Sequence, residues 1–316
     1  MNNIMPKVLV IGGNGFLGSN IVCHLKNIGY NLSVLDIKAP VNKLTGVNYF
    51  SGSVSNIQLL SDIMEGHDCL IYLKSSTTPG SSMIDVYKAY IEDLPELISV
   101  CGKCLEHSIK KIVFASSGGT VYTQSNIKKP YREIDPTCPI NHYGISKLAA
   151  ENILLMHNKL FGMKNIVLRI SNPYGLGQTP LSGVGLITTL AEKMIKGQTI
   201  QVCGSGDIIR DYVEVTDVAR AFALALNETV FSNFPVFNIG SGRGFSIMQI
   251  IHFLQEYLQI EPKIEFLPER IFDISYSVLD ISKAGKELGY TPLVMPESGI
   301  KEYVQILKNK IFGNQL

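Results

Sequence analysis

The stretch Lys7-Val8-Leu9-Val10-Ile11-Gly12-Gly13-Asn14-Gly15-Phe16-Leu17-Gly18 joins a short apolar run to a glycine-rich turn. Apolar residues then recur at positions 21, 22, 25 and 28, which is the period of a helix. A strand, a glycine-rich turn and a helix in this order predict the start of a dinucleotide-binding βαβ unit. We expect Gly12 to form the tight turn, Gly15 to let backbone amides approach a pyrophosphate, and Gly18 to let the helix pack on the strand. A strand-to-helix turn without a phosphate ligand is the alternative.

The second predicted strand, Leu32-Ser33-Val34-Leu35, ends in Asp36, which lies 18 residues beyond Gly18. An acid at this point bonds a ribose 2′-hydroxyl and repels a 2′-phosphate. The sequence therefore favours NAD over NADP as the cofactor. The positive charge of Lys38 nearby works against that discrimination.

Tyr143 and Lys147, in the segment Tyr143-Gly-Ile-Ser-Lys147, are four residues apart and would share one face of a helix. A free tyrosine has a pKa of about 10 and is a poor base at neutral pH. A nearby ammonium and a positively charged nicotinamide ring would favour the phenolate and lower that pKa. Lowering it from about 10 to about 7 takes about 4 kcal/mol. The pair predicts a proton-transfer site, although the same spacing also arises by chance on solvated helices.

The composition indicates a globular protein without an obvious macromolecular partner. The chain has 316 residues, 46% of them hydrophobic and 17% charged, and a formal net charge of +1, which gives no reason to expect nucleic acid or an anionic membrane. Apolar stretches are interrupted before transmembrane length, and the first residues carry no cleavable signal. Six cysteines, including Cys101 and Cys104, indicate free thiols in a cytoplasmic protein. The scattered histidines do not predict a metal site.

Further apolar strand candidates alternate with helical stretches along the chain. These candidates are residues 69–73, 112–115, 166–169 and 236–239. Such alternation predicts the α/β class, with a Rossmann-type doubly wound parallel sheet covered by helices on both faces. Ligands of such sheets bind at the carboxyl ends of the strands.

In its motifs the chain resembles the extended short-chain dehydrogenases/reductases of the nucleotide-sugar epimerase/dehydratase kind, over about residues 7–292. The matching motifs are the three-glycine turn, Ser116-Ser117 before Val121-Tyr122, Tyr143 with Lys147, residues 168–175, Arg210-Asp211-Tyr212-Val213, residues 238–242, and Arg270-x-x-Asp273. The resemblance implies an NAD-binding Rossmann domain of residues 1–175 plus about 207–245. It also implies a smaller, discontinuous nucleotide-sugar-binding domain of about 176–206 plus 246–316.

The resemblance further implies roles for the site residues. Tyr143 would take the proton of the sugar 4-hydroxyl, Ser117 would bond the same oxygen, and Lys147 would hold the cofactor ribose and lower the pKa of the tyrosine. Thr120 is the alternative hydroxyl, because the segment 115–120 is one residue longer than is usual. The implied cofactor contacts are Gly12, Gly15, Phe16, Leu17, Asp36, Ser53, Val54, Leu73, Lys74, Tyr143 and Lys147.

The segment between Ser117 and Tyr122 favours one reaction of this family. Dehydratases and decarboxylases carry acids there, whereas this chain has Gly118-Gly119-Thr120; it also lacks the cysteine of the deoxysugar epimerase-reductases. Lys74 resembles the strand-end lysine of UDP-galactose 4-epimerases; a lysine snorkelling at a strand end is the alternative. The resemblance thus implies inversion of C4 of a UDP-hexose or UDP-N-acetylhexosamine through a 4-keto intermediate. A 4-ketoreductase of a nucleotide-linked deoxysugar and a non-catalytic dinucleotide-binding sensor remain alternatives.

Five further residues match family contacts to the nucleotide sugar. Asn172, Arg210 and Arg270 match residues that hold the diphosphate, a role suited to guanidinium groups. Asp273 matches the acid that takes a ribose hydroxyl of the nucleoside. Ser277 occupies a sugar-pocket position where a small residue admits N-acetyl groups. A surface ion pair between Arg210 and its neighbour Asp211 is the alternative for that arginine.

The chain departs from the family pattern where an aspartate, an asparagine, a glycine and a proline are usual, at Ser53, Asp93, Thr123 and Leu176. None of these changes removes a catalytic group, but together they indicate an atypical branch. The helix that carries Tyr143 continues through Leu148, Ile153, Leu154 and Leu155, and relatives use the apolar surface of this helix to form homodimers.

Overall fold

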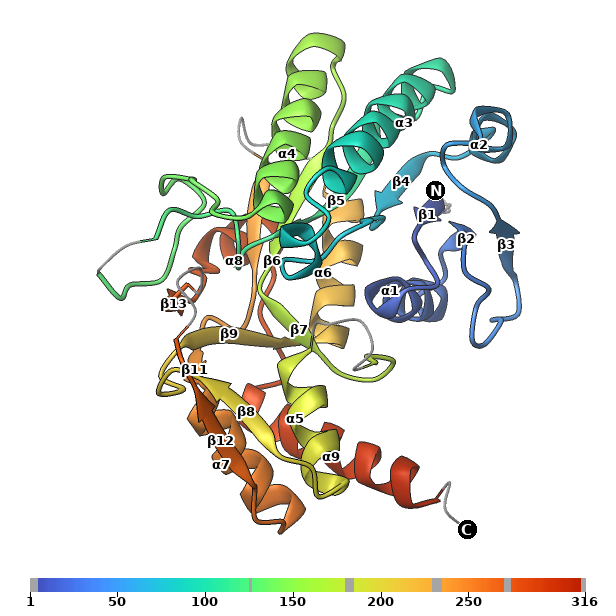
Figure 1. The fold of residues 1–316 in the computed structure, drawn as a ribbon. Helices are drawn as coiled ribbons and strands as arrows, with labels where there is room; N and C mark the ends of the chain where they lie inside the picture. Colours follow the sequence, from blue (N-terminus) through green and yellow to red (C-terminus); the bar gives the residue numbers. More distant parts are fainter. Residues whose placement is uncertain (1–4, 125–126, 180–184, 229–234, 270–273, 314–316) are drawn as a thin grey trace.

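Seven parallel strands form the main sheet in the part of the chain that this computed structural model describes, residues 5–124, 127–179, 185–228, 235–269 and 274–313 (Figure 1). Their order across the sheet is β10-β6-β5-β4-β1-β2-β3. The winding reverses between β1 and β4, and such a switch point is where open α/β sheets bind ligands. The predicted Rossmann-type sheet is therefore confirmed. Its strands are β1 Lys7–Ile11, β2 Asn31–Asp36, β3 Val47–Ser51, β4 Cys69–Tyr72, β5 Lys111–Ser117, β6 Ile166–Ile170 and β10 Val236–Ile239.

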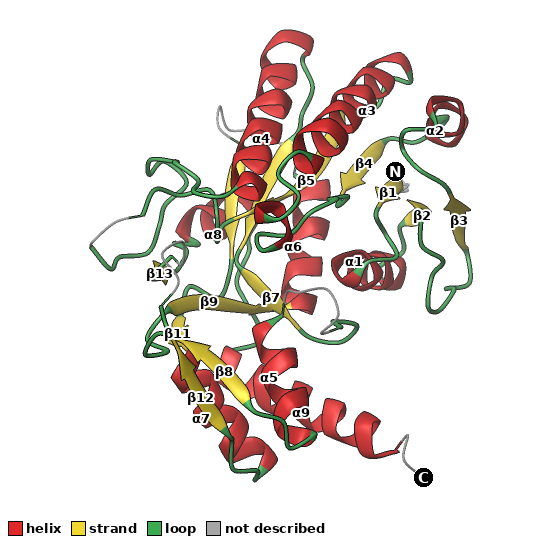
Figure 2. Ribbon diagram, in the orientation of Figure 1, coloured by secondary structure: helices red, strands yellow, loops and turns green. Residues whose placement is uncertain are grey.

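Helices cover both faces of the main sheet, as Figure 2 shows. One apolar core joins the sheet to α1 Phe16–Asn27, α6 Val215–Asn227 and α8 Ser282–Leu288. The core on the opposite face joins it to α2 Ile57–Met64, α3 Leu94–Glu106 and α4 His142–Phe161. Burial on both faces explains why the strands read as continuous apolar runs. None of the helices in the described ranges has both the length and the apolarity that crossing a membrane requires.

A second group of elements lies below the main sheet in Figure 1 and has an apolar core of its own. Its helices and outer strands are α5 Leu186–Ile195, α7 Ile247–Leu258, α9 Pro296–Gly313, β8 Ile200–Cys203 and β12 Ile264–Leu267. Between the two parts lies a joining sheet of four short strands, in which the other three strands each pair with β9. These strands are β7 Asn172–Tyr174, β9 Ile209–Glu214, β11 Gly244–Ser246 and β13 Tyr276–Ser277. Of the segment 207–245, α6 and β10 return to the main sheet as expected, whereas β9 belongs to this joining sheet.

The glycine-rich turn brings α1 very close to β1. Gly12 has a φ of +81°, a conformation that glycine adopts without the steric cost of a side chain. A Cβ on Gly18 would lie 2.3 Å from the carbonyl oxygen of Gly12, so only glycine lets the helix approach this closely. The roles expected of Gly12 in the turn and of Gly18 in helix packing are therefore confirmed.

The start of α4 is equally constrained. The side chain of Asn141 caps the helix by accepting a hydrogen bond from the Gly144 amide at 2.8 Å. A Cβ on Gly144 would lie 2.6 Å from the carbonyl oxygen of Thr120. These two contacts fix the first turn of α4, which carries Tyr143, against the loop that follows β5.

The outward side of α4 differs from the sequence-based expectation. Leu154 is fully buried, and Leu148, Ile153 and Leu155 pack, partly buried, against the apolar clusters beneath them. The prediction that these four residues offer a dimerisation surface is wrong for Leu154, whereas Leu148, Ile153 and Leu155 keep part of their surface exposed. The exposed large apolar residues of α4 are Ile145, Met156, Leu160 and Phe161.

The two helical glycines Gly18 and Gly102 should respond oppositely to alanine. We expect Gly18→Ala to lower the free energy of unfolding by about 1–3 kcal/mol, because its Cβ overlaps the Gly12 carbonyl and the helix must move. Gly102 lies in α3 with open space around its Cβ position, so Gly102→Ala should raise stability by about 0.5–1 kcal/mol. Denaturant unfolding of both variants measures the difference, and equal effects would contradict the packing role of Gly18.

Candidate active site

The turn between β1 and α1 fits a dinucleotide phosphate. Gly15 is the N-cap of α1, and within the described residues no side chain caps this end and no acid lies in its first turn. The backbone amides there remain available to an anion, which the helix dipole favours. A Cβ on Gly15 would have only Gly12 O, at 3.5 Å, among its near neighbours in the described chain, so the approach is open. Phe16 and Leu17 begin the helix at this point.

Asp36 lies beside that turn at the end of β2. Its Oδ2 accepts a hydrogen bond from the Asn14 amide and its Oδ1 one from the Lys38 amide, both at 2.9 Å. Each oxygen retains a further lone pair that a ribose hydroxyl can use. The side chain of Asn14 donates to the Lys38 carbonyl at 2.6 Å, so the Lys38 backbone is fixed while its side chain stays exposed. The arrangement fits an unphosphorylated ribose, as the prediction of NAD requires.

The remaining predicted cofactor residues border the same edge. Ser53 follows Gly52, whose amide donates to the Asp36 carbonyl at 3.1 Å. Leu73 donates its amide to Ile11 O at 3.0 Å, which sets Leu73 and Lys74 beside the glycine turn. Val54 is only 4% exposed, because its side chain belongs to the core under α2 and α3. A ligand could therefore contact the backbone of Val54 but not its side chain.

Tyr143 and Lys147 lie together on α4, as their spacing predicts. The amide of Tyr143 donates to Ser82 Oγ at 3.1 Å, and Ser82 is fully buried. Lys147 is also buried; its Nζ lies 5.5 Å from the centre of the Tyr143 ring and donates to the Ala115 carbonyl of β5 at 3.0 Å. Both residues belong to α4, and the hydrogen bond of Lys147 ties this part of the helix to the end of β5.

The protein groups alone oppose a phenolate at this site. Burial, and then the Asp93 carboxylate, raise the pKa of Tyr143 to about 12. Burial lowers the pKa of Lys147 to about 8, while Asp93 acts in the opposite direction. The sequence predicts a lowered tyrosine pKa, and the difference arises because desolvation disfavours the charged form of each group. Tyr143 therefore needs additional positive charge in the site before it accepts protons at neutral pH.

The candidate hydroxyls differ in their surroundings. Ser116 is buried, and its hydroxyl is already engaged because it donates to the buried Glu151 carboxylate of α4. Ser117 is the last residue of β5 and is partly exposed. Thr120 is buried, and its Oγ1 has no hydrogen-bond partner among the described residues. Exposure to a ligand therefore favours Ser117 over Thr120.

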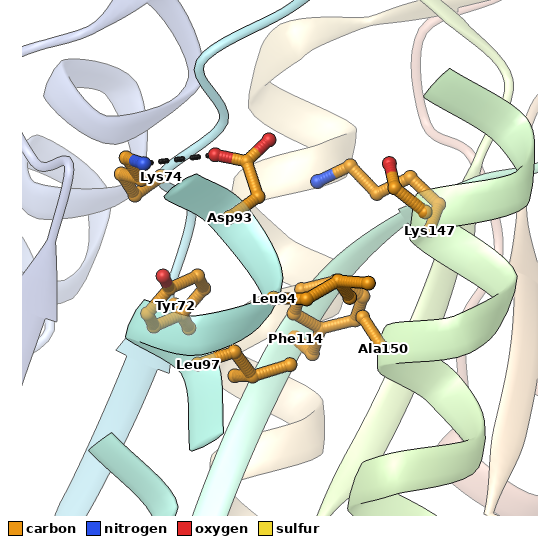
Figure 3. Close-up of a pocket in the computed structure, with 9 residues that line it drawn as sticks. Tyr72, Lys74, Asp93, Leu94, Leu97, Phe114, Lys147 and Ala150 are labelled. Atoms are coloured by element: carbon orange, nitrogen blue, oxygen red, sulfur yellow. Dashed lines mark hydrogen bonds and ion pairs between the residues drawn. The ribbon is translucent and has the colours of Figure 1, made fainter. Parts of the chain in front are cut away.

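Lys74 forms an ion cluster rather than snorkelling into solvent. Its Nζ lies 2.8 Å from Oδ1 of Asp93 and also pairs with Glu96. Figure 3 shows the Asp93 carboxylate between the ammonium groups of Lys74 and Lys147. Glu96 in turn accepts a hydrogen bond from Ser55 Oγ at 2.6 Å. Within the described residues no group of three or more His, Cys, Asp or Glu is arranged to hold a metal ion.

The candidate substrate residues meet on the joining sheet. Ser277 of β13 is the register partner of Arg210 on β9, and Asn172, which begins β7, is the register partner of Tyr212 on β9. The side chain of Asn172 donates to the Asp211 carbonyl at 2.9 Å. Arg270 and Asp273 lie outside the described residues.

Asp211 organises this region, and the sequence reasoning missed its role. Its carboxylate is fully buried and accepts hydrogen bonds from the Ser241 amide and hydroxyl, both at 2.8 Å, and from the Gly242 amide at 3.1 Å. The Leu279 amide donates to it at 3.3 Å. The alternative of a surface ion pair with Arg210 is therefore wrong for Asp211. Its position in the Arg210–Val213 motif was the only available signal, because its partners lie 30 or more residues away.

Comparison with known proteins agrees with this geometry. Residues 8–240 match the family model described as the NAD dependent epimerase/dehydratase family. A dTDP-4-dehydro-6-deoxyglucose reductase of Escherichia coli is 30% identical over 313 residues, covering 96% of this chain and 98% of that protein. A UDP-glucose 4-epimerase of Halalkalibacterium halodurans is 30% identical over 304 residues, covering 90% of each. The structure of a UDP-glucose 4-epimerase from Thermotoga maritima with UDP-glucose aligns with a TM-score of 0.88 at 30% identity, covering 96% of this chain and 99% of that one.

Replacing Asp36 should weaken the discrimination against a 2′-phosphate. We expect Asp36→Asn to lower the affinity ratio of NAD to NADP at least ~10-fold, because a difference of about 1.4 kcal/mol in charge repulsion gives that factor. Calorimetric titration with each dinucleotide measures the ratio. The control is Lys38→Ala, which removes an exposed cation and should leave NAD binding intact while weakening NADP. An unchanged ratio in Asp36→Asn would contradict the ribose contact.

Proposed function

The chain belongs to the NAD dependent epimerase/dehydratase family, and from that premise we propose that it inverts C4 of a UDP-hexose or a UDP-N-acetylhexosamine. The observation that carries the proposal is the placement of Tyr143 and Lys147 one turn apart on α4, with Lys147 bonded to β5 two residues before its last residue, Ser117. Lys147 also lines one pocket with Lys74. The structurally similar Thermotoga protein, a UDP-glucose 4-epimerase solved with UDP-glucose, supports a UDP-sugar as the substrate class.

In the proposed reaction the chain's own groups handle the proton and the sugar oxygen. Tyr143 accepts the proton of the 4-hydroxyl during oxidation and returns a proton when the 4-keto sugar is reduced. Ser117 bonds the same oxygen, and Lys147 holds the cofactor ribose with its ammonium group. Bound NAD supplies the hydride acceptor, the corresponding donor and, in its oxidised form, one positive charge. Because the keto sugar turns before C4 regains its hydrogen, the opposite configuration results.

In this proposal the smaller, second domain binds the nucleotide end of the substrate. Residues 1–175 plus about 207–245 would bind NAD, and about 176–206 plus 246–316 would bind the nucleotide sugar, with β9 shared between them. Arg210 and Arg270 would hold the diphosphate with Asn172, and Asp273 the nucleoside ribose. Ser277, which is 3% exposed, would line the sugar pocket, where its small side chain would admit an N-acetyl group.

A 4-ketoreductase is the second candidate function, because the reductase of Escherichia coli matches this chain as well as the epimerases do. Such an enzyme would oxidise one added NADH for each keto sugar reduced. An epimerase instead regenerates its cofactor in each turnover and needs none added. Lys74, which resembles the epimerase lysine, favours the first candidate.

The proposal is tested by incubating the purified protein with UDP-glucose and UDP-N-acetylglucosamine separately, without added dinucleotide, and resolving the C4 epimers.

Tyr143→Phe should retain NAD and lose more than ~100-fold in turnover, as expected for loss of a proton-transfer group. Ser117→Ala should lose ~10-fold or more, because a hydrogen bond to the reacting oxygen is removed. A larger loss in Thr120→Val than in Ser117→Ala would transfer the hydroxyl role to Thr120. Failure to epimerise either sugar, together with oxidation of added NADH by a nucleotide-linked 4-keto deoxysugar, would favour the reductase.

We also infer a homodimer formed through α3 and α4, which lie side by side in Figure 1. Large apolar side chains are exposed along both helices, among them Ile98 and Leu105 on α3, and Met156 and Leu160 on α4. Exposed apolar surface of this kind marks interaction sites when it is contiguous.

The six free cysteines support a location in the reducing cytoplasm.

Charge placed on this surface should dissociate the dimer. We expect Ile98→Glu combined with Leu160→Glu to give a monomer, because two copies of each charge would be buried in a symmetric interface. The matched control is Leu293→Glu, which alters an equally exposed leucine outside α3 and α4. Sedimentation measurements give the assembly state, and a double variant that stays dimeric would exclude this interface.

A further inference from the structure

We propose that Asp93 is a positioning residue of the proposed reaction: held by Lys74 and Ser76, its carboxylate faces Lys147, one helical turn from Tyr143, and controls how strongly the phenol keeps its proton. The inference rests on the proposed function, and it assigns a role to an acid at a position where the family pattern has an asparagine.

The Asp93 carboxylate is fixed in place by several donors. Asp93 is the last residue of a π-helical turn, η2 (Ala89–Asp93), and its side chain is 13% exposed. Lys74 Nζ and the Ser76 amide each lie 2.8 Å from its Oδ1, and the Ser75 hydroxyl donates to Oδ2 at 3.3 Å. Single π-turns inside helices are frequent at functional sites. An acid tied down in this way presents a fixed charge to its neighbours.

The charges of the cluster do not cancel. Lys74 serves two carboxylates, those of Asp93 and Glu96, so the three side chains carry a net charge of −1. Lys147 lies on the other side of Asp93 from Lys74 (Figure 3). Tyr143 is one helical turn from Lys147 on α4. The negative charge at Asp93 thus lies on the Lys147 side of the pair that would transfer the proton.

Three other ionisable groups near the pair have partners or surroundings of their own. Glu151, one turn further along α4, is paired with Arg169 of β6 at 2.7 Å. The ring of His142 is hydrogen-bonded to the Tyr90 hydroxyl of η2 at 2.9 Å. Burial and the nearby acids hold the pKa of Tyr72, at the end of β4, well above its usual range, so that phenol is neutral. Among the described residues, Asp93 is the acid whose charge acts on both Tyr143 and Lys147, whereas Glu151 acts on Lys147 alone.

The direction of the effect follows from its sign. A carboxylate beside Tyr143 disfavours the phenolate and raises its pKa, and beside Lys147 it favours the ammonium. Removing the charge therefore lets Tyr143 lose its proton at a lower pH. In general, a unit charge about 10 Å from a titrating group shifts its pKa by ~1 unit at an effective dielectric constant of about 20.

The test compares two substitutions that remove the same charge from the same cluster. We expect D93N to move the acid limb of the pH profile of kcat/KM, with a UDP-sugar, about one pH unit downward. Glu96 lies beyond Lys74, bound to it and to Ser55, so E96Q should move the limb by less than about a third of that. Equal shifts in the two variants, or a shift in neither, would overturn the role of Asp93.

A second readout separates this inference from the proposed function. The ultraviolet phenolate absorbance of NAD-loaded protein, measured against pH and corrected with Tyr143→Phe, reports the ionisation of Tyr143 without any substrate. D93N should lower its midpoint and K74Q, which strips Asp93 of its countercharge, should raise it. Opposite shifts without epimerisation of any UDP-sugar would reject the proposed function and keep the inference. A midpoint that is the same in D93N, K74Q and the unmodified protein would reject the inference itself.

Discussion

Desolvation of Tyr143 and Lys147 is the constraint to which the rest of the site responds. Burial raises the pKa of the phenol to about 12 and lowers that of the amine to about 8, so it works against the charged form of each group, although the amine stays mostly protonated at pH 7. In a site with little water each neighbouring charge acts strongly. The ionisation of the pair is therefore governed by the few charges that remain near it, those of Asp93, Lys74 and a bound cofactor. Such a site transfers protons at neutral pH only when the positive charge of the bound cofactor is also present.

Two buried carboxylates, those of Glu151 and Asp211, fix the elements around Tyr143 and Lys147 in place. Glu151 accepts a bond from Ser116 and pairs with Arg169, and both members of this ion pair are 3% exposed or less. Asp211 gathers donors from the loops after β10 and β13. Buried pairs add little net stability, but removing one partner costs about 3–5 kcal/mol because a charge is left uncompensated. They therefore specify the arrangement of β5, α4 and the joining sheet more than they stabilise it.

The sequence predicted the parts of the site that depend on local rules. The glycine turn, Asp36 at the end of β2, and Tyr143 with Lys147 on one helix follow from spacing within single elements. What it did not predict depends on contacts between distant segments. Asp93 and Lys74 are 19 residues apart and meet only because η2 packs beside the end of β4. Helical periodicity likewise could not say which side of α4 faces the core, so Leu154 was placed on the wrong surface.

The central claim, that one carbon loses and regains the same hydrogen beside Tyr143, is tested most directly with UDP-glucose carrying deuterium at C4. After incubation with the protein and no added dinucleotide, the account predicts UDP-galactose that retains deuterium at C4. Hydrogen from solvent at C4, or deuterium released into free NADH, would contradict it.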